Sequence, residues 1–127
     1  MAKIFLDTNV FIDLIEDRGN KNIAQVLDGQ KVYVSPLSTH IMFYVGKKRV
    51  PDSKANATVS QLEIVSLTKE IHNHSLDGPT SDLEDNIQLH SAAEAECDYF
   101  LTSDEKLLKM KFFGKIRVVN TLPPQTH

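Results

Sequence analysis

Short apolar segments that end abruptly at polar residues alternate with amphipathic stretches along this chain. The first of them, Lys3 to Leu6, runs directly into Asp7-Thr8-Asn9, and apolar residues then recur at helical spacing. Asp, Thr and Asn are favoured at a helix N-terminus, so a helix is expected from about residue 9 to 17. A strand followed at once by a helix is the repeating unit of a parallel α/β sheet.

The same unit recurs further along the chain. Strands are predicted at residues 32–34, 63–67, 99–101 and 116–119, and helical patterns occupy the intervals between them, including one that Ser81 is expected to cap and that runs to about Glu96. This alternation predicts a three-layer α/β/α fold with a central parallel sheet of four to five short strands. The length of 127 residues fits one domain over residues 1–127.

Three features indicate the setting of the protein. No apolar run approaches the roughly 20 residues that span a bilayer, so no membrane association is expected. Cys97 is the single cysteine, which rules out an internal disulfide and suits a reducing compartment. The acid at position 7 comes too early for a signal peptide. We therefore expect a cytoplasmic protein.

The net charge of −3 is unevenly distributed along the chain. Residues 77–105 contain nine acids and no Lys or Arg, whereas residues 106–117 contain five bases and no acid. A second basic cluster lies mid-chain and consists of Lys47, Lys48, Arg49 and Lys54. Runs of like charge are commonly solvated surface. The alternative is an acidic pocket flanked by basic patches, which suits a metal site acting on a polyanion.

Several acids fall at equivalent places in the predicted architecture. Asp7 and Asp104 each directly follow a short apolar strand, and ligands of open α/β sheets bind outside the carboxyl ends of the strands. Asp85 lies in the first turn of the helix that precedes the strand at 99–101, and Asp82 is three residues earlier on the same helix face. We therefore expect three or four carboxylates to come together from distant segments.

Carboxylates at close range repel one another, and a bound cation is the natural resolution. Oxygen ligands without Cys or paired His favour Mg²⁺ or Mn²⁺ over Zn²⁺. Such a metal generates hydroxide from water and stabilises charge on a phosphodiester. Each acid also has a local explanation, because Asp7 and Asp104 are good helix caps and Asp82 with Asp85 complements a helix dipole. The prediction depends on their joint placement.

Three strings carry a resemblance to a known family. They are residues 4–10 (IFLDTNV), residues 82–89 (DLEDNIQL) with Ala92-Ala93 after them, and residues 97–104 (CDYFLTSD). Together they resemble the PIN domain, the ribonuclease fold of the VapC-type toxins of bacterial toxin–antitoxin pairs. A closing strand that ends near residues 120–123 also fits, so the resemblance spans essentially the whole chain in the family's order and spacing.

The resemblance implies divalent-metal-dependent cleavage of RNA, with Mg²⁺ or Mn²⁺ as the cofactor. Asp7, Asp85 and Asp104 match the family's metal-binding acids, and Asp82 is a weaker candidate ligand. Asn9 and Ser103 match positions that support the site by hydrogen bonding. The resemblance also implies a homodimer and, for a toxin, a small antitoxin protein that masks the acidic pocket.

One departure from the family pattern concerns the helix after the second strand. The family normally has an acid there, usually Glu, but residues 29–51 contain no Asp or Glu. The missing acid falls at Ile41 or its neighbour His40. The loss of one carboxylate is expected to weaken metal binding or to leave one metal instead of two.

Three hypotheses about function follow from these observations. The first is an Mg²⁺- or Mn²⁺-dependent endoribonuclease in which Asp7, Asp85 and Asp104 hold the metal. Its candidates for binding the RNA backbone are Lys47, Lys48, Arg49 and Lys106. The second is a catalytically silent PIN fold that binds RNA or a partner protein. The third, a phosphoacceptor receiver domain, requires paired acids after the first strand and an Asp after the third, and the sequence has neither.

Overall fold

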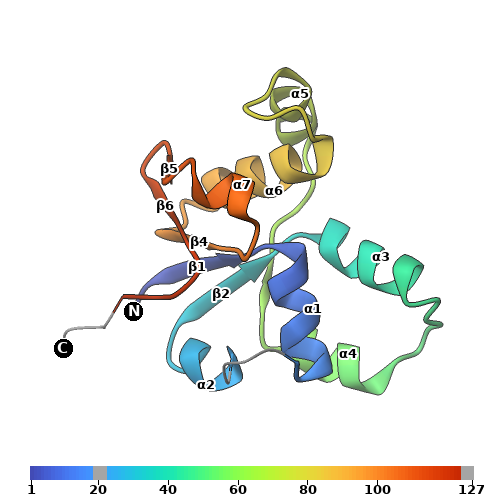
Figure 1. The fold of residues 1–127 in the computed structure, drawn as a ribbon. Helices are drawn as coiled ribbons and strands as arrows, with labels where there is room; N and C mark the ends of the chain where they lie inside the picture. The colour runs from blue at the N-terminus through green and yellow to red at the C-terminus, as the bar shows by residue number, and fades with distance from the viewer. Residues whose placement is uncertain (19–22, 124–127) are drawn as a thin grey trace.

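The computed structural model describes residues 1–18 and 23–123, in which strands and helices alternate (Figure 1). The strands are β1 (Lys3–Leu6), β2 (Lys31–Val34), β3 (Glu63–Ile64), β4 (Tyr99–Leu101), β5 (Phe112–Phe113) and β6 (Ile116–Val119). The helices are α1 (Thr8–Glu16), α2 (Ile23–Leu27), α3 (Pro36–Val45), α4 (Ser53–Val59), α5 (Lys69–Asp77), α6 (Leu83–Glu94) and α7 (Glu105–Leu108). The predicted α/β alternation is therefore confirmed.

The strands form one sheet in the order β3-β2-β1-β4-β6-β5. All neighbouring pairs are parallel except β5 and β6, which pair antiparallel through Phe112 with Arg117 and Phe113 with Ile116. The prediction of a central parallel sheet of four to five strands is confirmed, because β3, β2, β1, β4 and β6 are parallel, and β5 adds an antiparallel edge strand that was not predicted. A two-residue strand is too short to give the alternation by which strands are found in a sequence.

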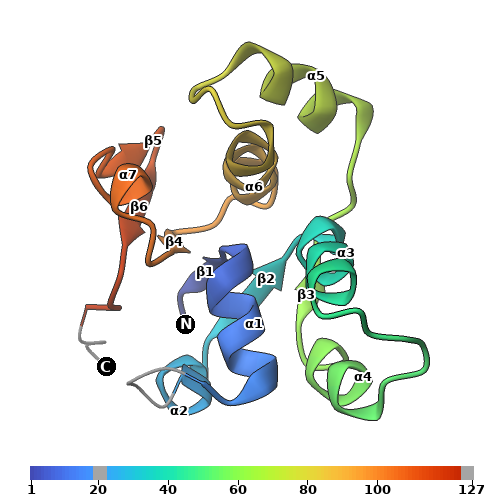
Figure 2. The same cartoon turned by 45° about the vertical axis from the view of Figure 1, so that its right-hand side comes forward.

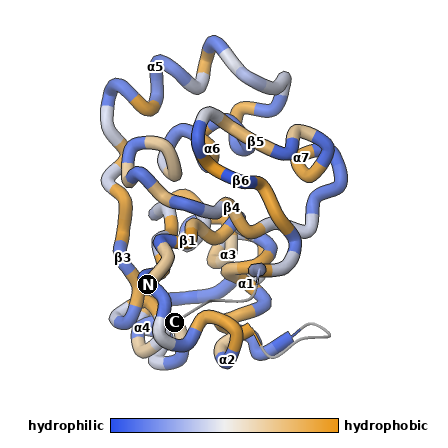
Figure 3. The backbone as a smooth tube through the Cα atoms, turned by 90° about the vertical axis from the view of Figure 1, so that its left-hand side faces the viewer, coloured by the Kyte–Doolittle hydropathy of each residue, from blue (hydrophilic) through white to orange (hydrophobic). Residues whose placement is uncertain are grey.

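Apolar side chains on the two faces of the sheet form two separate cores. Alternation along β1 sends Ile4 and Leu6 to a core with α1, α2, α3 and α4, and sends Phe5 to a core with α5, α6 and α7. The sheet thus lies between two helical layers (Figure 1). Figure 3 shows hydrophobic colour along β1 and much of β6, whereas α5 is mostly hydrophilic.

The strand order reverses between β1 and β4, which makes their carboxyl ends the switch point of the sheet. The backbone joins these ends directly, since the Asp7 N–H donates to the Leu101 carbonyl at 3.0 Å. Chain segments that begin α1, α3 and α6 surround this end of β1 (Figure 2). The architecture therefore gathers residues from distant parts of the sequence at one edge.

The local chemistry of the helix starts explains several element boundaries. Asp7, Asp82 and Asp104 are the N-cap residues of α1, α6 and α7, and each accepts a backbone hydrogen bond through its carboxylate. Ser81, which the sequence analysis assigned as the cap of α6, lies one residue before the actual cap. None of the helices in the described ranges is long and apolar enough to cross a bilayer.

Candidate acidic site at the switch point

Asp7 is the most deeply buried acid of the candidate site, with an exposed fraction of 5%. Its Oδ1 accepts the Thr8 backbone N–H at 2.8 Å, and its Oδ2 accepts the Thr102 hydroxyl at 2.7 Å. Thr102 follows β4, so this side-chain bond joins the ends of the two central strands. Both oxygens of the carboxylate are thereby held in place.

Asp104 is tied to the same threonine. Its backbone N–H donates to the Thr102 hydroxyl oxygen at 3.0 Å, and its Oδ1 accepts the Lys106 backbone N–H at 2.8 Å. The half-buried Asp104 carboxylate contributes to the electrostatic environment of Asp7. Helix capping therefore occupies only one oxygen of the Asp104 carboxylate. Asp104 can thus cap α7 and also take part in an acidic site.

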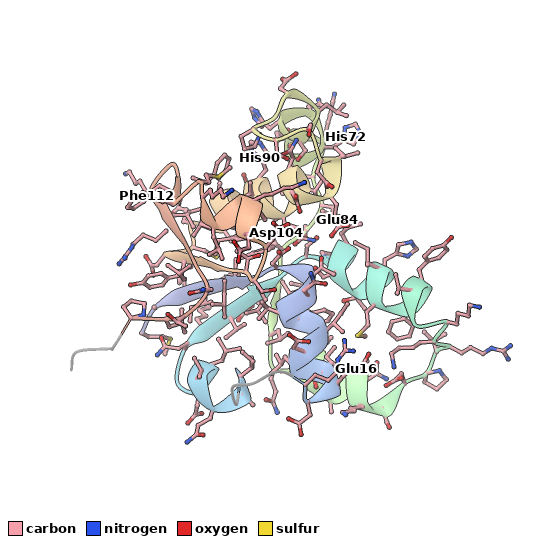
Figure 4. All side chains as sticks on the ribbon, in the orientation of Figure 1. Glu16, His72, Glu84, His90, Asp104 and Phe112 are labelled. Atoms are coloured by element: carbon pink, nitrogen blue, oxygen red, sulfur yellow. The ribbon has the colours of Figure 1, made fainter. Side chains whose placement is uncertain are left out.

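The N-terminus of α6 supplies three further carboxylates. Asp82 caps the helix through a 3.0 Å hydrogen bond from the Asp85 N–H to its Oδ1. Asp85 is half-buried and interacts electrostatically with Asp82, Asp7 and Asp104. Glu84, which the sequence analysis did not select, is also half-buried, and the Thr8 hydroxyl hydrogen-bonds its carboxylate. Figure 4 shows Glu84 and Asp104 at the end of the sheet above α1.

A buried polar network lies beneath Glu84. Gln88, one helical turn after Glu84, donates from Nε2 to the Thr8 hydroxyl oxygen at 3.0 Å and to the Ser38 hydroxyl oxygen at 3.1 Å. The Thr8 and Ser38 hydroxyls are 2.9 Å apart. Either hydroxyl can be the donor in this bond. The network links α1, α3 and α6 and orients Thr8 toward Glu84.

Burial and mutual repulsion raise the pKa values of three of these acids. Burial raises the pKa of Asp7, although hydrogen bonds from Thr102 and Thr8 partly oppose it, and the charges of Asp104 and Asp82 raise it further. Burial is the main cause that raises the pKa of Asp85 to about 6, and the charges of Asp82 and Asp7 are the next largest causes. The pKa of Glu84 is also raised, chiefly by burial. The cluster therefore carries unfavourable negative charge.

Basic side chains do not neutralise this cluster. In residues 1–18 and 23–123, the ion pairs are Arg18 with Asp13 at 3.8 Å and Lys48 with Asp52 at 4.0 Å, and neither belongs to the site. Buried carboxylates without a cationic partner are costly, and this cost is relieved when a cation binds. The donor set consists of carboxylate and hydroxyl oxygens, which suits a hard divalent cation such as Mg²⁺ or Mn²⁺.

The described residues do not form a closed metal cage. Across these ranges, no group of three or more His, Cys, Asp or Glu side chains is arranged to hold one ion. Mg²⁺ commonly takes only one or two protein carboxylates and keeps several waters. The acidic residues therefore fit an open, partly hydrated cation site in the kind and charge of their ligands.

The structure separates the predicted supporting residues from the ones that make the hydrogen bonds. Asn9 and Ser103 are both exposed. Their neighbours Thr8 and Thr102 are buried and supply the contacts to Glu84 and Asp7. Alternation along the chain after β4 explains the second case, because the residue after Leu101 points into the protein and the next one points out. For Glu84, the signal in the sequence is that it lies four residues before Gln88, which places both polar side chains on the same face of the helix.

The basic candidates lie at two different places. Lys106, on α7, is exposed and adjoins the acidic site through its backbone bond to Asp104. Lys47 and Arg49 are exposed in the segment that follows α3, and Lys48 is half-buried and paired with Asp52. The helix α3 itself, where the sequence analysis noted a missing acid, contributes Ser38 to the site.

Carboxylates without cationic partners, gathered at the switch point of a mostly parallel sheet, define an α/β protein with an acidic site at the carboxyl ends of its strands. The sequence model of the PIN domain matches residues 4–113, so the chain belongs to the PIN domain family. The receiver-domain alternative is thereby excluded.

Two solved structures share the fold. One is VapBC2 from Rickettsia felis bound to a DNA fragment from its promoter, with a TM-score of 0.66 at 14% identity over 92% of this chain and 97% of that chain. The other is a toxin–antitoxin complex from Klebsiella pneumoniae, with a TM-score of 0.65 at 21% identity over 81% of this chain and 88% of that chain. No curated protein matched the sequence.

Proposed function

We propose that this protein is a divalent-metal-dependent endoribonuclease and the toxin of a toxin–antitoxin pair. The observation that carries the proposal is the cluster of Asp7, Asp85 and Asp104 at the switch point, in which burial raises the pKa values of Asp7 and Asp85 and with which no base is ion-paired within the described ranges. Membership of the PIN domain family and the fold shared with two toxin–antitoxin structures support it.

Asp7, Asp85 and Asp104 would hold Mg²⁺ or Mn²⁺, directly or through the water molecules that the ion keeps, with Asp82 as an additional ligand candidate. When bound, the ion supplies Lewis-acid activation of water and stabilises charge on the phosphodiester. Thr102 fixes the Asp7 carboxylate, and the threonine's bond to the Asp104 backbone sets the spacing between the two acids. Lys106 and the segment Lys47–Arg49 bind the phosphate backbone of the RNA.

Glu84 would replace the acid that is missing from residues 29–51. It comes from α6 instead of α3, but the Thr8–Ser38–Gln88 network aims Thr8 at it. Its carboxylate restores the charge that the loss of an acid on α3 removes. We assign Glu84 to the active site as its additional carboxylate, and Asn9 and Ser103 keep the role of exposed polar residues at its rim.

The experiment is cleavage of RNA by the purified protein with Mn²⁺, compared between wild type and Asp7→Asn. Asparagine retains the helix-capping function, so the variant removes charge from the site without removing the cap. Asp13→Asn on the same helix is the matched control, because Asp13 pairs with Arg18 outside the site. We expect cleavage to be lost in Asp7→Asn and kept in Asp13→Asn. Equal cleavage by both variants would refute the assignment.

The alternative is a catalytically silent PIN fold that binds RNA or a partner protein, and the absence of an acid in residues 29–51 is the observation that favours it. Calorimetry with Mn²⁺ separates the two. A silent site shows no saturable heat at millimolar metal, whereas the nuclease site does.

The toxin proposal also specifies partners and setting. A small antitoxin protein masks the acidic site, and the toxin forms a homodimer in the cytoplasm. Light scattering on the isolated chain tests the homodimer. Co-expression with a short neighbouring open reading frame, followed by purification through a tag on this chain, tests the antitoxin.

A further inference from the structure

The helix α3 connects two chemically different regions of the protein. At its N-terminal end, Ser38 is hydrogen-bonded to Thr8 beside the acidic site. At its C-terminal end, the chain continues into the exposed bases Lys47 and Arg49. The whole stretch of residues 29–51 contains no acid, so a polyanion that lies along this helix meets no carboxylate from it.

The outward face of α3 carries two aromatic rings. Ser38 and Met42 are buried against the protein, and His40 is two residues, or about 200°, around the helix from Ser38. His40 and Tyr44 are therefore on the opposite face, one turn apart, and both are exposed. Their rings stack at 6.3 Å between centroids with an interplanar angle of 23°. Tyr44 is 78% exposed, so most of its ring surface is open to solvent despite the contact with His40.

An aromatic pair beside basic side chains is the combination that binds single-stranded nucleic acid. Each base has a π-face that stacks on an aromatic ring irrespective of sequence, and Lys and Arg hold the backbone. From Ser38 to Tyr44 the helix rises about 9 Å, which is the length of about three stacked nucleotides. The helix is thus long enough to carry a short run of bases between the basic segment and the acidic site.

We propose that the exposed face of α3 formed by His40 and Tyr44 is a stacking platform for single-stranded RNA, whose backbone Lys47 and Arg49 bind and whose path leads to the acidic site. The inference rests on the proposed function, because it assumes that the bound RNA continues into the acidic site and is cleaved there. It assigns α3 a role that differs from supplying a carboxylate. An acid at position 40 or 41 would oppose that role by repelling phosphate.

Charge favours RNA over a protein partner as the occupant. The acid nearest in sequence after α3 is Asp52, which pairs with Lys48, so Lys47 and Arg49 remain available. Within the described residues, neither Lys47 nor Arg49 is ion-paired. Free cations next to exposed rings match a phosphate backbone with attached bases.

The test is the affinity of a fluorescently labelled single-stranded RNA, measured by anisotropy in the Asp7→Asn background so that the RNA stays intact. We expect Tyr44→Ala to weaken binding about tenfold, equivalent to about 1.4 kcal/mol, and Tyr44→Phe to bind within about twofold of the parent. Lys47→Ala should lower the slope of log affinity against log salt by about 0.7, whereas Tyr44→Ala leaves that slope unchanged.

Phe112→Ala is the matched control. Phe112 is also an exposed aromatic, at 56%, but it lies on β5 on the opposite side of the molecule from α3 (Figure 4). It should bind RNA as the parent does. Circular dichroism melts confirm that the variants fold, which their exposed positions favour.

Three results would overturn the inference. The first is equal RNA affinity of Tyr44→Ala and the parent, and the second is an equal loss in Tyr44→Ala and Tyr44→Phe. The third is a dimer that Tyr44→Ala dissociates while RNA affinity stays unchanged, since α3 would then face a second copy. Failure of the proposed function is separate, because it is the absence of RNA cleavage by the wild-type protein and is measured independently of binding.

Discussion

Replacement of Thr102 by Val should destabilise the protein more than any other change of a single hydroxyl at the acidic site. Valine has nearly the shape of threonine, so the variant removes the hydroxyl and leaves the packing in place. Thr102 is buried, and its hydroxyl donates to Asp7 Oδ2 at 2.7 Å and accepts the Asp104 N–H at 3.0 Å. Both bonds are lost in the variant.

The magnitude follows from the type of each bond. A hydrogen bond to a charged group contributes about 1.5–3 kcal/mol, and a bond between neutral groups contributes about 0.5–1.5 kcal/mol. The expected loss in the free energy of unfolding is therefore about 2–4 kcal/mol. For a domain of this length, that corresponds to a melting temperature lower by about 8–15 °C.

Urea denaturation at neutral pH without metal measures the change, with an unchanged slope as evidence that the compactness of the two states is unaltered. Ser103→Ala is the matched control, because Ser103 is the adjacent hydroxyl but is exposed, and it should change the free energy of unfolding by less than about 0.5 kcal/mol. Thr102→Ser keeps the hydroxyl and should therefore retain most of the free energy of unfolding that Thr102→Val loses.

The pH dependence of the Thr102→Val effect supplies a second check. The Thr102 bond lowers the pKa of Asp7, so its removal raises that pKa further. The cost is greatest above the pKa of Asp7, where the carboxylate is charged, and shrinks as the pH falls and Asp7 is protonated. A loss below about 0.5 kcal/mol, or one equal to that of Ser103→Ala, would refute the reasoning.

Three further predictions concern other parts of the molecule. The pKa of Asp85 is about 6 in the folded protein against an ordinary value of 3.8, so the folded state binds more protons than the unfolded state between these two pH values. The free energy of unfolding of the metal-free protein should therefore fall by about 1–2 kcal/mol as the pH rises from the lower value to the higher one. Urea titrations at several pH values measure this fall, and a free energy of unfolding that stays constant with pH would contradict the prediction. Burial raises the pKa of the Cys97 thiol to about 12, so a thiol-specific disulfide reagent at about pH 8 should label the unfolded protein and leave the native one unlabelled. Leu89→Ala should lower the free energy of unfolding by about 2–5 kcal/mol, because Leu89 is fully buried. Leu83→Ala on the same helix is the control and should lower it by less than about 0.5 kcal/mol, because Leu83 is 46% exposed. Equal decreases in the melting temperature of the two variants would contradict the packing argument.

The central α/β frame could be read from the sequence because its signals are local. The apolar run Lys3–Leu6 followed by Asp7 specifies a strand and the helix that begins after it, and Tyr99–Leu101 with Asp104 repeats the pattern. The edge strand β5 could not be found, because two residues give no periodicity and the strand exists only through its pairing with β6.

The candidate site shows the same division at the level of single residues. Asp7 and Asp104 follow strands, so their common edge could be predicted from topology rules alone. The choice of Thr102 over Ser103, and of Thr8 over Asn9, depends on which neighbour points inward. A shift of one residue reverses that direction in the extended segment after β4 and turns it by about 100° in α1, and the sequence shows two adjacent polar residues in each case.

By itself, the sequence determined the class of fold, the caps of α1 and α7 and the acids at the strand ends, because each depends on residues within one or two turns of the chain. Only the tertiary structure decided which other groups complete the site. Glu84 meets Thr8, and Thr8 meets Ser38 and Gln88, across separations of 30 and 80 residues. Such contacts are set by how three helices pack against one sheet edge, and packing is a property of the folded chain as a whole.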